Sequence, residues 1–288
     1  MTNLVILGSS GFLGKHFVNK IILEKFNVKV MIHNTDLDFV GEKFQGDILN
    51  QHDLEENIST DDIVINFVGQ LESNFSKFLD LNIDGGFNLL NTSLKKKPKK
   101  IILISSINVY GESSVPSKEI NSLLPKTPYG LVKSITEKIY ENFARIHGLN
   151  ITILRMANIY GPNKSNGIIF NLIKSTKNSE FPVILFNNGT QFRDFLYVDD
   201  AINAIIQAIK INQDGFNVFN ISSAKRFSNL ELVDAIENIS GKKTHIKLNK
   251  SYSDETCIWA DNSKAKKLLK FSPCFSLNDG LKILINKN

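Results

Sequence analysis

The sequence contains little cysteine and no long hydrophobic run. Its 288 residues include two cysteines, Cys257 and Cys274, too few for a disulfide framework or, by themselves, for a zinc site. This content is typical of a reducing compartment, so we expect a cytoplasmic protein. No apolar run approaches the roughly 18 residues of a membrane span. The apolar start at residues 4–7 stops at Gly8, too early for a secretory leader.

An excess of one charge sign is also missing. The 34 Lys and Arg against 29 Asp and Glu give a net charge of +5, which is too mild to indicate a nucleic-acid-binding surface. Arginine itself is scarce and occurs at positions 145, 155, 193 and 226. Since lysine supplies most of the positive charge, each arginine is a candidate for a role that needs a planar guanidinium. Hydrophobic residues make up 42% of the chain, enough for a sizeable core.

Short β-branched runs alternate with helical stretches in the first half of the chain. Apolar runs at 62–67 and 100–104 flank a helical stretch at 75–94, and a long helix at 129–147 precedes a strand at 151–154. Near-continuous apolar strands joined by helices are typical of a parallel sheet covered on both faces. The pattern predicts an α/β, Rossmann-like doubly wound fold. We expect residues 1–160 to form a dinucleotide-binding Rossmann domain.

After residue 160 the alternation loosens. Helical patterns occur at 168–176, 199–210, 229–239 and 263–269. Ser228 and Glu231 have the spacing of a capping box for the third of these helices. We expect residues 161–288 to form mainly a smaller substrate-binding lobe, with some segments returning to the sheet.

A glycine-rich segment directly follows the first strand and opens the first helix. It reads Gly8-Ser9-Ser10-Gly11-Phe12-Leu13-Gly14. Glycines at this spacing let the backbone approach a pyrophosphate, and the helix N-terminus offers N–H groups to it. The segment therefore predicts a bound dinucleotide, NAD or NADP. Asp47, which follows the third strand, could accept a hydrogen bond from an adenine amino group.

Tyr129 and Lys133 lie four residues apart on one predicted helix, so their side chains share a face. A nearby ammonium favours the phenolate, and we therefore expect Lys133 to lower the pKa of Tyr129. Tyr129 would then serve as general acid and base for a sugar or alcohol hydroxyl. Ser105 and Ser106 follow the strand at 100–104, at the sheet edge where ligands bind, and either hydroxyl could hold the reacting oxygen.

Taken together, these motifs resemble the extended short-chain dehydrogenase/reductase family. The sequence is most similar to the nucleotide-sugar branch of that family, the UDP-glucose 4-epimerase-like proteins. Further segments match in the family's order and extend the similarity over nearly the whole chain, at 106–111, 158–162, 193–200 and 259–265. The resemblance implies an enzyme that uses NAD or NADP to transfer hydride at a sugar carbon of a nucleotide sugar.

The resemblance also implies roles for single residues. The catalytic residues it implies are Ser106, Tyr129 and Lys133. The cofactor-binding residues it implies are Gly8, Ser10, Gly11, Phe12, Leu13, Gly14, His33, Asn34, Asp47, Ile48, Phe67, Val68, Gly69, Asn82, Tyr129 and Lys133. The substrate-binding residues it implies are Ser106, Asn108, Asn158, Ile184, Phe186, Arg193 and Asp254. Family members commonly pair, which implies a homodimer built from the helices at 75–94 and 129–147. No metal, nucleic-acid or membrane partner is expected.

Within this assignment, Asn158 and Arg193 hold the substrate's diphosphate, and Ile184 and Phe186 lie at the nucleotide base. Arginine suits the diphosphate because its guanidinium binds phosphate oxygens in a bidentate manner. Of the other arginines, the resemblance gives Arg155 a structural position, and we expect those at positions 145 and 226 on the surface.

The sequence departs from the family pattern at three places. Where the epimerases carry an acidic residue for the adenosine ribose, this chain has His33, so we expect NADP to be tolerated. Ser251 stands where a second diphosphate-binding arginine is usual. The strand end Ser106-Ile107-Asn108 lacks the acid and base that the family's dehydratases use for water elimination, which argues against 4,6-dehydration.

Three functions follow from these observations. The end-to-end similarity favours a 4-epimerase that keeps NAD bound, whereas His33 favours an NADPH-dependent reductase of a nucleotide 4-ketosugar. A third possibility is a catalytically inactive relative that binds a dinucleotide as a sensor or assembly protein. Such relatives usually lose the tyrosine or the lysine, and here both Tyr129 and Lys133 are intact. The sugar and the base are set by the loops around 163–192 and 245–256.

Overall fold

The computed structural model describes residues 1–34, 39, 41–69, 74–178, 180, 182–251 and 257–286. The chain forms two compact units, each assembled from three segments. The first comprises Met1–Ser106, Pro128–Arg155 and Ile202–Phe219, and the second comprises Ile107–Thr127, Met156–Ala201 and Asn220–Asn288. The sequence prediction placed the boundary at residue 160 and expected some later segments to return to the sheet. In the structure, residues 107–127 belong to the second unit and residues 202–219 belong to the first.

A seven-stranded sheet forms the centre of the fold, in the order β11-β6-β5-β4-β1-β2-β3. Its strands are β1 (Thr2–Leu7), β2 (Phe26–Ile32), β3 (Glu42–Gln45), β4 (Asp62–Asn66), β5 (Lys100–Ser106), β6 (Ile151–Met156) and β11 (Phe216–Ile221). Strand β1 pairs in parallel with both β2 and β4, and β4 pairs in parallel with β5. The strand order reverses between β1 and β4, and ligands of doubly wound folds bind at such a switch point. The predicted Rossmann-like fold is confirmed.

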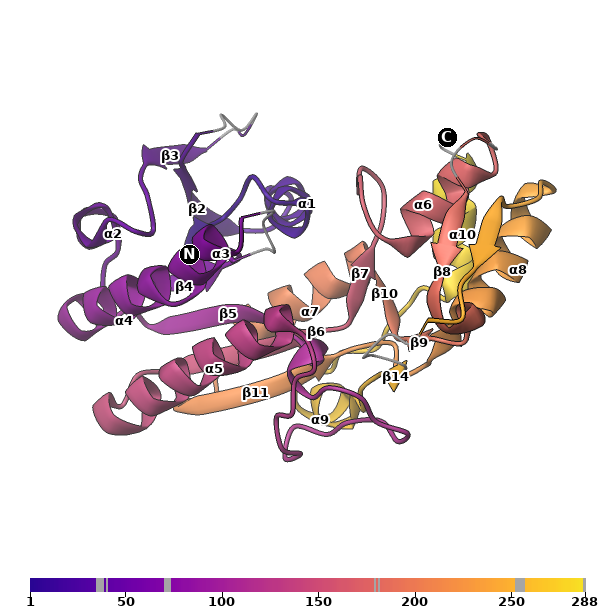
Figure 1. The fold of residues 1–288 in the computed structure, drawn as a ribbon. Coiled ribbons are helices and arrows are strands. Elements are labelled where there is room, and N and C mark those ends of the chain that lie inside the picture. Colours follow the sequence, from indigo (N-terminus) through magenta and orange to yellow (C-terminus); the bar gives the residue numbers. More distant parts are fainter. Residues whose placement is uncertain are drawn as a thin grey trace. The chain divides into compact units, whose positions relative to one another are not determined.

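Helices flank the central sheet of the first unit (Figure 1), whose inner strands β4, β5 and β6 are almost wholly buried. These helices are α1 (Phe12–Ile21), α2 (Gln51–Asn57), α3 (Phe75–Asn82), α4 (Asp84–Lys96), α5 (Pro128–His147) and most of α7 (Val198–Lys210). Helix α4 packs against α2, α3 and α5. The fully buried Tyr140 of α5 contacts α4 and accepts a hydrogen bond from Asn66 at the end of β4.

The single helix predicted at 75–94 is wrong in one respect, because it is divided at Ile83. The side-chain amide of Asn82 donates to the carbonyl oxygen of Phe78, which competes with regular helix bonding. Gly85 and Gly86 then follow, and a Cβ on Gly85 would lie 2.9 Å from Ile48. Close packing of α4 against Ile48 therefore depends on glycine at this position.

The described part of the second unit contains short strands and helices, with three small sheets ordered β10-β7, β12-β9-β14 and β13-β8. The bounds of its elements are η1 (Ile107–Val109), β7 (Asn158–Tyr160), α6 (Ile168–Ser175), β8 (Val183–Leu185), η2 (Phe186–Gly189), β9 (Phe192–Arg193), β10 (Phe195–Tyr197), β12 (Phe227–Ser228), α8 (Asn229–Ser240), β13 (Ile246–Leu248), β14 (Cys257–Ile258), α9 (Ser263–Leu268) and α10 (Leu277–Asn286). The capping box predicted between Ser228 and Glu231 is confirmed at the start of α8.

Helix α10 was not predicted, although Leu277, Leu281 and Leu284 have helical spacing and are buried. Within the described residues, no helix has both the length and the apolar character needed to cross a membrane.

Candidate active site

The glycine-rich loop between β1 and α1 is tightly packed against the loop after β4. Gly8 has a φ of +79°, and a Cβ there would lie 2.7 Å from the backbone nitrogen of Val68. A Cβ on Gly14 would lie 2.4 Å from the carbonyl oxygen of Gly8. Only glycine fits at these two positions. Gly11 caps α1 without a side-chain hydrogen bond, so the positive end of the helix dipole faces this loop. The other cofactor residues predicted in this loop, Ser10, Phe12 and Leu13, are partly or fully exposed.

The loop after β4 carries the predicted cofactor residues Phe67, Val68 and Gly69. The first two are half-buried, and Gly69 has a φ of +100°. A Cβ on Gly69 would lie 2.3 Å from Oδ1 of Asn82, which is itself only 4% exposed. Asn82 thus packs directly against the glycine and keeps the loop close to α3. The structure brings these residues and the glycine-rich loop together at the switch point of the sheet.

His33 and Asp47, which were expected to contact different parts of the cofactor, touch each other. Nε2 of His33 lies 3.3 Å from Oδ2 of Asp47, and both side chains are partly exposed. Oδ1 of Asp47 accepts a 3.0 Å hydrogen bond from the backbone nitrogen of Leu49. A carboxylate beside His33 opposes the approach of a 2′-phosphate. Asn34 is exposed next to His33, whereas Ile48 is buried, so only the backbone of Ile48 could reach a ligand.

The predicted catalytic residues meet between the end of β5 and the start of α5. A hydrogen bond joins the side chains of Ser106 and Tyr129. The Tyr129 ring stacks on Phe78 of α3, with centroids 5.6 Å apart and an interplanar angle of 20°. Lys133 is 4% exposed, and its Nζ donates to the carbonyl oxygen of Ile104 at 3.4 Å. Buried contacts on three elements therefore fix the side chains of this constellation.

The net pKa of Tyr129 is raised, although a lowered pKa was expected. Burial raises the pKa of Tyr129 above its ordinary value, and the hydrogen bond from Ser106 only partly opposes this effect. Burial also lowers the pKa of Lys133 to about 8, while the negative charge of Glu137 acts in the opposite direction. The i, i+4 spacing placed the two groups correctly, but it carried no information on how deeply they are buried.

The two serines at the end of β5 have different partners. The hydroxyl of Ser105 donates to the carboxylate of Glu137, whereas Ser106 bonds Tyr129. This separation supports Ser106 as the residue that holds the reacting oxygen. Glu137 was not singled out from the sequence, although it lies four residues after Lys133 and therefore on the same helix face.

Two predicted substrate residues lie close together in the second unit. Asn158 begins β7, and both its backbone nitrogen and its Nδ2 donate to the carbonyl oxygen of Asp194 at 3.0 Å. Arg193 immediately precedes Asp194, and its Nη1 donates to the carbonyl oxygen of Phe192 at 2.9 Å. Asp194 is fully buried and accepts from Ser223, which anchors this strand segment. Asn158 and Arg193 are themselves only half-buried.

The remaining substrate candidates are dispersed in the second unit. Ile184 on β8 is 51% exposed and Phe186 at the start of η2 is 43% exposed, so each offers an apolar surface. Asn108 lies in η1 and is partly exposed. Asp254 lies outside the described residues.

The other arginines lie largely where the sequence placed them. Arg145 is exposed and pairs with Glu141 at 2.8 Å. Arg226 is also exposed, but its guanidinium stacks on the rings of Phe192 and Trp259, at 4.8 and 5.1 Å. This stacking brings together residues far apart in the sequence, so no local pattern signalled it.

Comparison with known proteins identifies the family. The sequence profile of the NAD dependent epimerase/dehydratase family matches residues 4–222. The chain is similar to an uncharacterised UDP-glucose epimerase of Bacillus subtilis (strain 168), with 29% identity over 96% of this chain and 95% of the relative. It is 34% identical to a UDP-glucuronate 4-epimerase of Thermodesulfobacterium geofontis over 73% of this chain and 65% of the relative.

Solved structures give the same result. A UDP-glucuronic acid 4-epimerase from Bacillus cereus, solved with a fluorinated UDP-sugar and NAD, has a TM-score of 0.89 at 28% identity and covers 99% of this chain and 98% of its own. A UDP-glucose 4-epimerase from Thermotoga maritima, solved with UDP-glucose, has a TM-score of 0.87 at 28% identity, with 99% and 97% covered. The resemblance inferred from the motifs is confirmed.

Proposed function

Because the chain belongs to the NAD dependent epimerase/dehydratase family, we propose that it is a UDP-sugar 4-epimerase that uses NAD. The observation that carries this proposal is the meeting of Ser106, Tyr129 and Lys133 at the end of β5. The adjoining residues Ile107 and Asn108 supply neither the acid nor the base of a dehydratase. The relatives named as UDP-sugar 4-epimerases support the choice of substrate class.

The described residues fit a dinucleotide. Gly8 and Gly14 leave no room for a Cβ, so only glycines allow the tight turn by which this loop leads from β1 into α1. The N-terminus of α1 favours a pyrophosphate there. Residues 67–69 would lie along the dinucleotide, and the His33–Asp47 pair would lie at the adenosine end, where the carboxylate favours NAD over NADP. Bound NAD would supply the acceptor and donor of hydride at the sugar carbon.

The side chains of this site account for the proton transfers. The phenolate form of Tyr129 takes the proton from the sugar hydroxyl when the carbon is oxidised, and the phenol returns it after the sugar has presented its other face. Ser106, bonded to Tyr129, holds the same oxygen. Since the pKa of Lys133 is about 8, its amine is mostly charged at neutral pH and stabilises the phenolate that acts as this base.

In this proposal the second unit binds the nucleotide part of the substrate. Arg193 and Asn158 contact the diphosphate, and Arg193 supplies charge-assisted hydrogen bonds. Ile184 and Phe186 offer exposed apolar surface to the base, and Asn108 contacts the sugar. Asp254 completes the set assigned from the family pattern.

We also propose that the protein is a homodimer paired through α3, α4 and α5. Large apolar side chains stay exposed on these helices, with Phe75 at 45%, Phe87 at 37%, Leu131 at 50% and Ile135 at 43%. Two-fold pairing would bury them, and closed dimers are the commonest oligomers. Light scattering at micromolar concentration should give a dimer mass, and Ile135→Glu should give a monomer. Both described cysteines are free thiols, which suits the proposed cytoplasmic location.

The proposed use of NAD has a direct test. The purified protein is denatured and the released nucleotide is identified by chromatography. We expect NAD in near-stoichiometric amount, retained through purification. Released NADP, or a site that exchanges NADPH freely, would contradict the epimerase proposal and favour a ketosugar reductase.

A further inference from the structure

Glu137 is a buried acid on the catalytic face of α5. Tyr129, Lys133 and Glu137 follow one another at intervals of four residues, so they lie along one side of the helix. Glu137 is 2% exposed and Lys133 is 4% exposed. A carboxylate at such a depth is unusual and requires partners that compensate its lost hydration.

Those partners come from two neighbouring strands of the sheet. Nε of Arg155 on β6 donates to both carboxylate oxygens of Glu137, at 3.2 and 3.0 Å, and its Nη2 donates at 2.7 Å. Arg155 is 5% exposed, so the whole ion pair is removed from water. The hydroxyl of Ser105 on β5 donates to Oε1 of Glu137. The carboxylate thus ties α5 to β5 and β6 beside the catalytic residues.

Stability alone does not explain this arrangement. A buried ion pair costs so much hydration that well-packed apolar residues of similar size often stabilise a protein at least as well. The contacts of Glu137 are, however, specific to the site. Ser105 directly precedes Ser106, and the charge of Glu137 raises the pKa of Lys133 against the effect of burial.

We propose that Glu137 is a positioning residue for the reaction, which holds the strand end that carries Ser106 and places a negative charge one helical turn from Lys133. Arg155 serves in this arrangement as the partner that makes the buried carboxylate tolerable. The inference concerns residues of the first unit, and it depends on the proposed epimerase function only where activity is measured.

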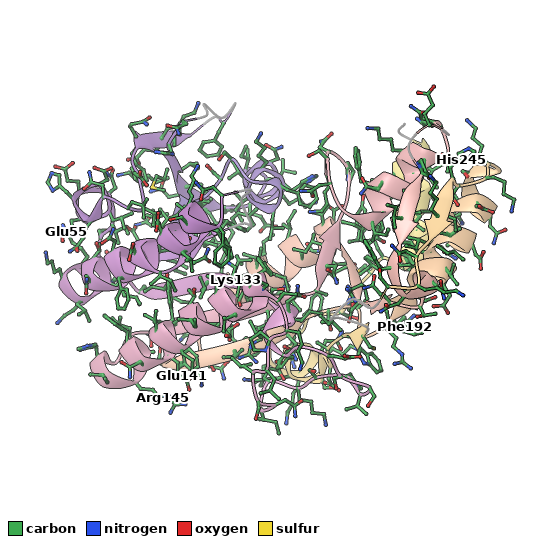
Figure 2. The ribbon with its side chains drawn as sticks, viewed as in Figure 1. Glu55, Lys133, Glu141, Arg145, Phe192 and His245 are labelled. Atoms are coloured by element: carbon green, nitrogen blue, oxygen red, sulfur yellow. The ribbon has the colours of Figure 1, made fainter. Side chains whose placement is uncertain are left out.

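The test compares three variants. Glu137→Gln removes the charge and keeps the shape. Glu137→Gln with Arg155→Met also removes the arginine, so that no buried charge is left without a partner. Glu141→Gln is the matched control, because Glu141 lies one turn farther along α5 and pairs with Lys138 and Arg145 at the surface. Figure 2 labels Lys133 on this helix and, farther along it, Glu141 and Arg145.

The first readout is the pH profile of epimerisation of a UDP-sugar, measured beside the thermal melt. For Glu137→Gln we expect a lower melting temperature. We also expect the loss of activity at alkaline pH to begin about one pH unit lower, which corresponds to a tenfold change in the ionisation equilibrium of Lys133. The double variant should recover much of the wild-type melting temperature, but its activity should still be lost at the lower alkaline pH. Glu141→Gln should match wild type in both respects.

Two results would overturn the proposal. If the double variant recovers the wild-type pH profile together with its stability, Glu137 is only part of a structural ion pair. If Glu137→Gln folds and keeps the wild-type profile, its charge does not act on Lys133. Should the single variant fail to fold, the double variant decides by its profile alone.

A second readout separates this inference from the proposed function. Protein labelled with ¹⁵N at the lysine side chains reports the titration of Lys133, whose signal is identified by its loss in Lys133→Met. We expect a midpoint near pH 8 in wild type and a lower one in both Glu137 variants. Equal midpoints in wild type and the Glu137 variants would refute the role of Glu137. If the midpoints differ as expected but wild type epimerises no UDP-sugar, only the UDP-sugar proposal is refuted.

Discussion

The two compact units differ in how they hold their candidate functional residues. In the first unit, Ser106 and Lys133 are buried and bonded, and Tyr129 stacks on Phe78. In the second, Asn158 and Arg193 are half-buried on strands of two or three residues. In the proposed assignment, the residues of proton transfer are therefore held by the core of the fold. The residues proposed to bind the substrate lie on short elements that contribute less to the core.

The largest expected effect comes from the first unit. Tyr129→Phe and Lys133→Met should each lower turnover by at least about 100-fold, because each removes a group needed for proton transfer. Binding of NAD should survive in Tyr129→Phe, since the glycine-rich loop is unchanged, and calorimetry can measure this. Near-normal turnover in either variant, with an unchanged thermal melt, would contradict the catalytic assignment.

Arg193→Ala should separate the two units functionally. Loss of a charge-assisted hydrogen bond to a diphosphate costs about 1.5–3 kcal/mol, so the affinity for the UDP-sugar should fall by roughly 10- to 100-fold. Affinity for NAD should change little, because the residues assigned to it lie in the other unit. Arg145→Ala, which removes an exposed arginine of α5, is the control. Equal losses for both ligands would refute the division of labour.

A smaller effect is expected at the edge of the first unit. The carboxylate of Asp47 beside His33 should favour NAD, because it repels the extra phosphate of NADP. Asp47→Asn should therefore narrow the preference for NAD by about tenfold, which corresponds to roughly 1.4 kcal/mol. Titrations of both cofactors against both proteins measure it. If wild type already binds NADP as tightly as NAD, the inference from this pair is wrong.

The smallest effect concerns stability in the second unit. Burial raises the pKa of Asp194 to about 7. Between its ordinary value and that pH, the folded protein binds more protons than the unfolded chain, so this group stabilises the fold at low pH. That contribution is lost as the pH rises through about 7. As the pH is raised from about 4 to about 7, the melting temperature of Asp194→Asn should fall less steeply than that of wild type. Identical declines would show that Asp194 does not titrate there.

Most of the fold could be predicted because its signals are local. Apolar runs located the central strands, and the capping box located the start of α8. The division of the helix at Ile83 was missed, because the apolar pattern continues across this residue. The helix is interrupted there by the side-chain hydrogen bond of Asn82 and by Gly85 and Gly86, which follow.

The site was predicted only as far as spacing carries information. The i, i+4 pattern placed Tyr129 and Lys133 on one face, but the pKa of Tyr129 depends on burial, which a spacing cannot show. Glu137 was missed because a charged residue in a helix usually faces solvent, and its partner Arg155 lies on a separate strand. The contact of His33 with Asp47 likewise joins residues that follow two different strands, β2 and β3.

The proposed 4-epimerase activity is tested most directly with a UDP-sugar that carries deuterium at carbon 4. Purified protein is incubated with labelled UDP-glucose or UDP-glucuronic acid, without added cofactor, and the products are followed by NMR. We predict that the 4-epimer forms and keeps its deuterium at carbon 4, because the hydride removed from that carbon returns to it. A product that has lost the label or carries it at another carbon, or no product from either sugar, would contradict the proposal.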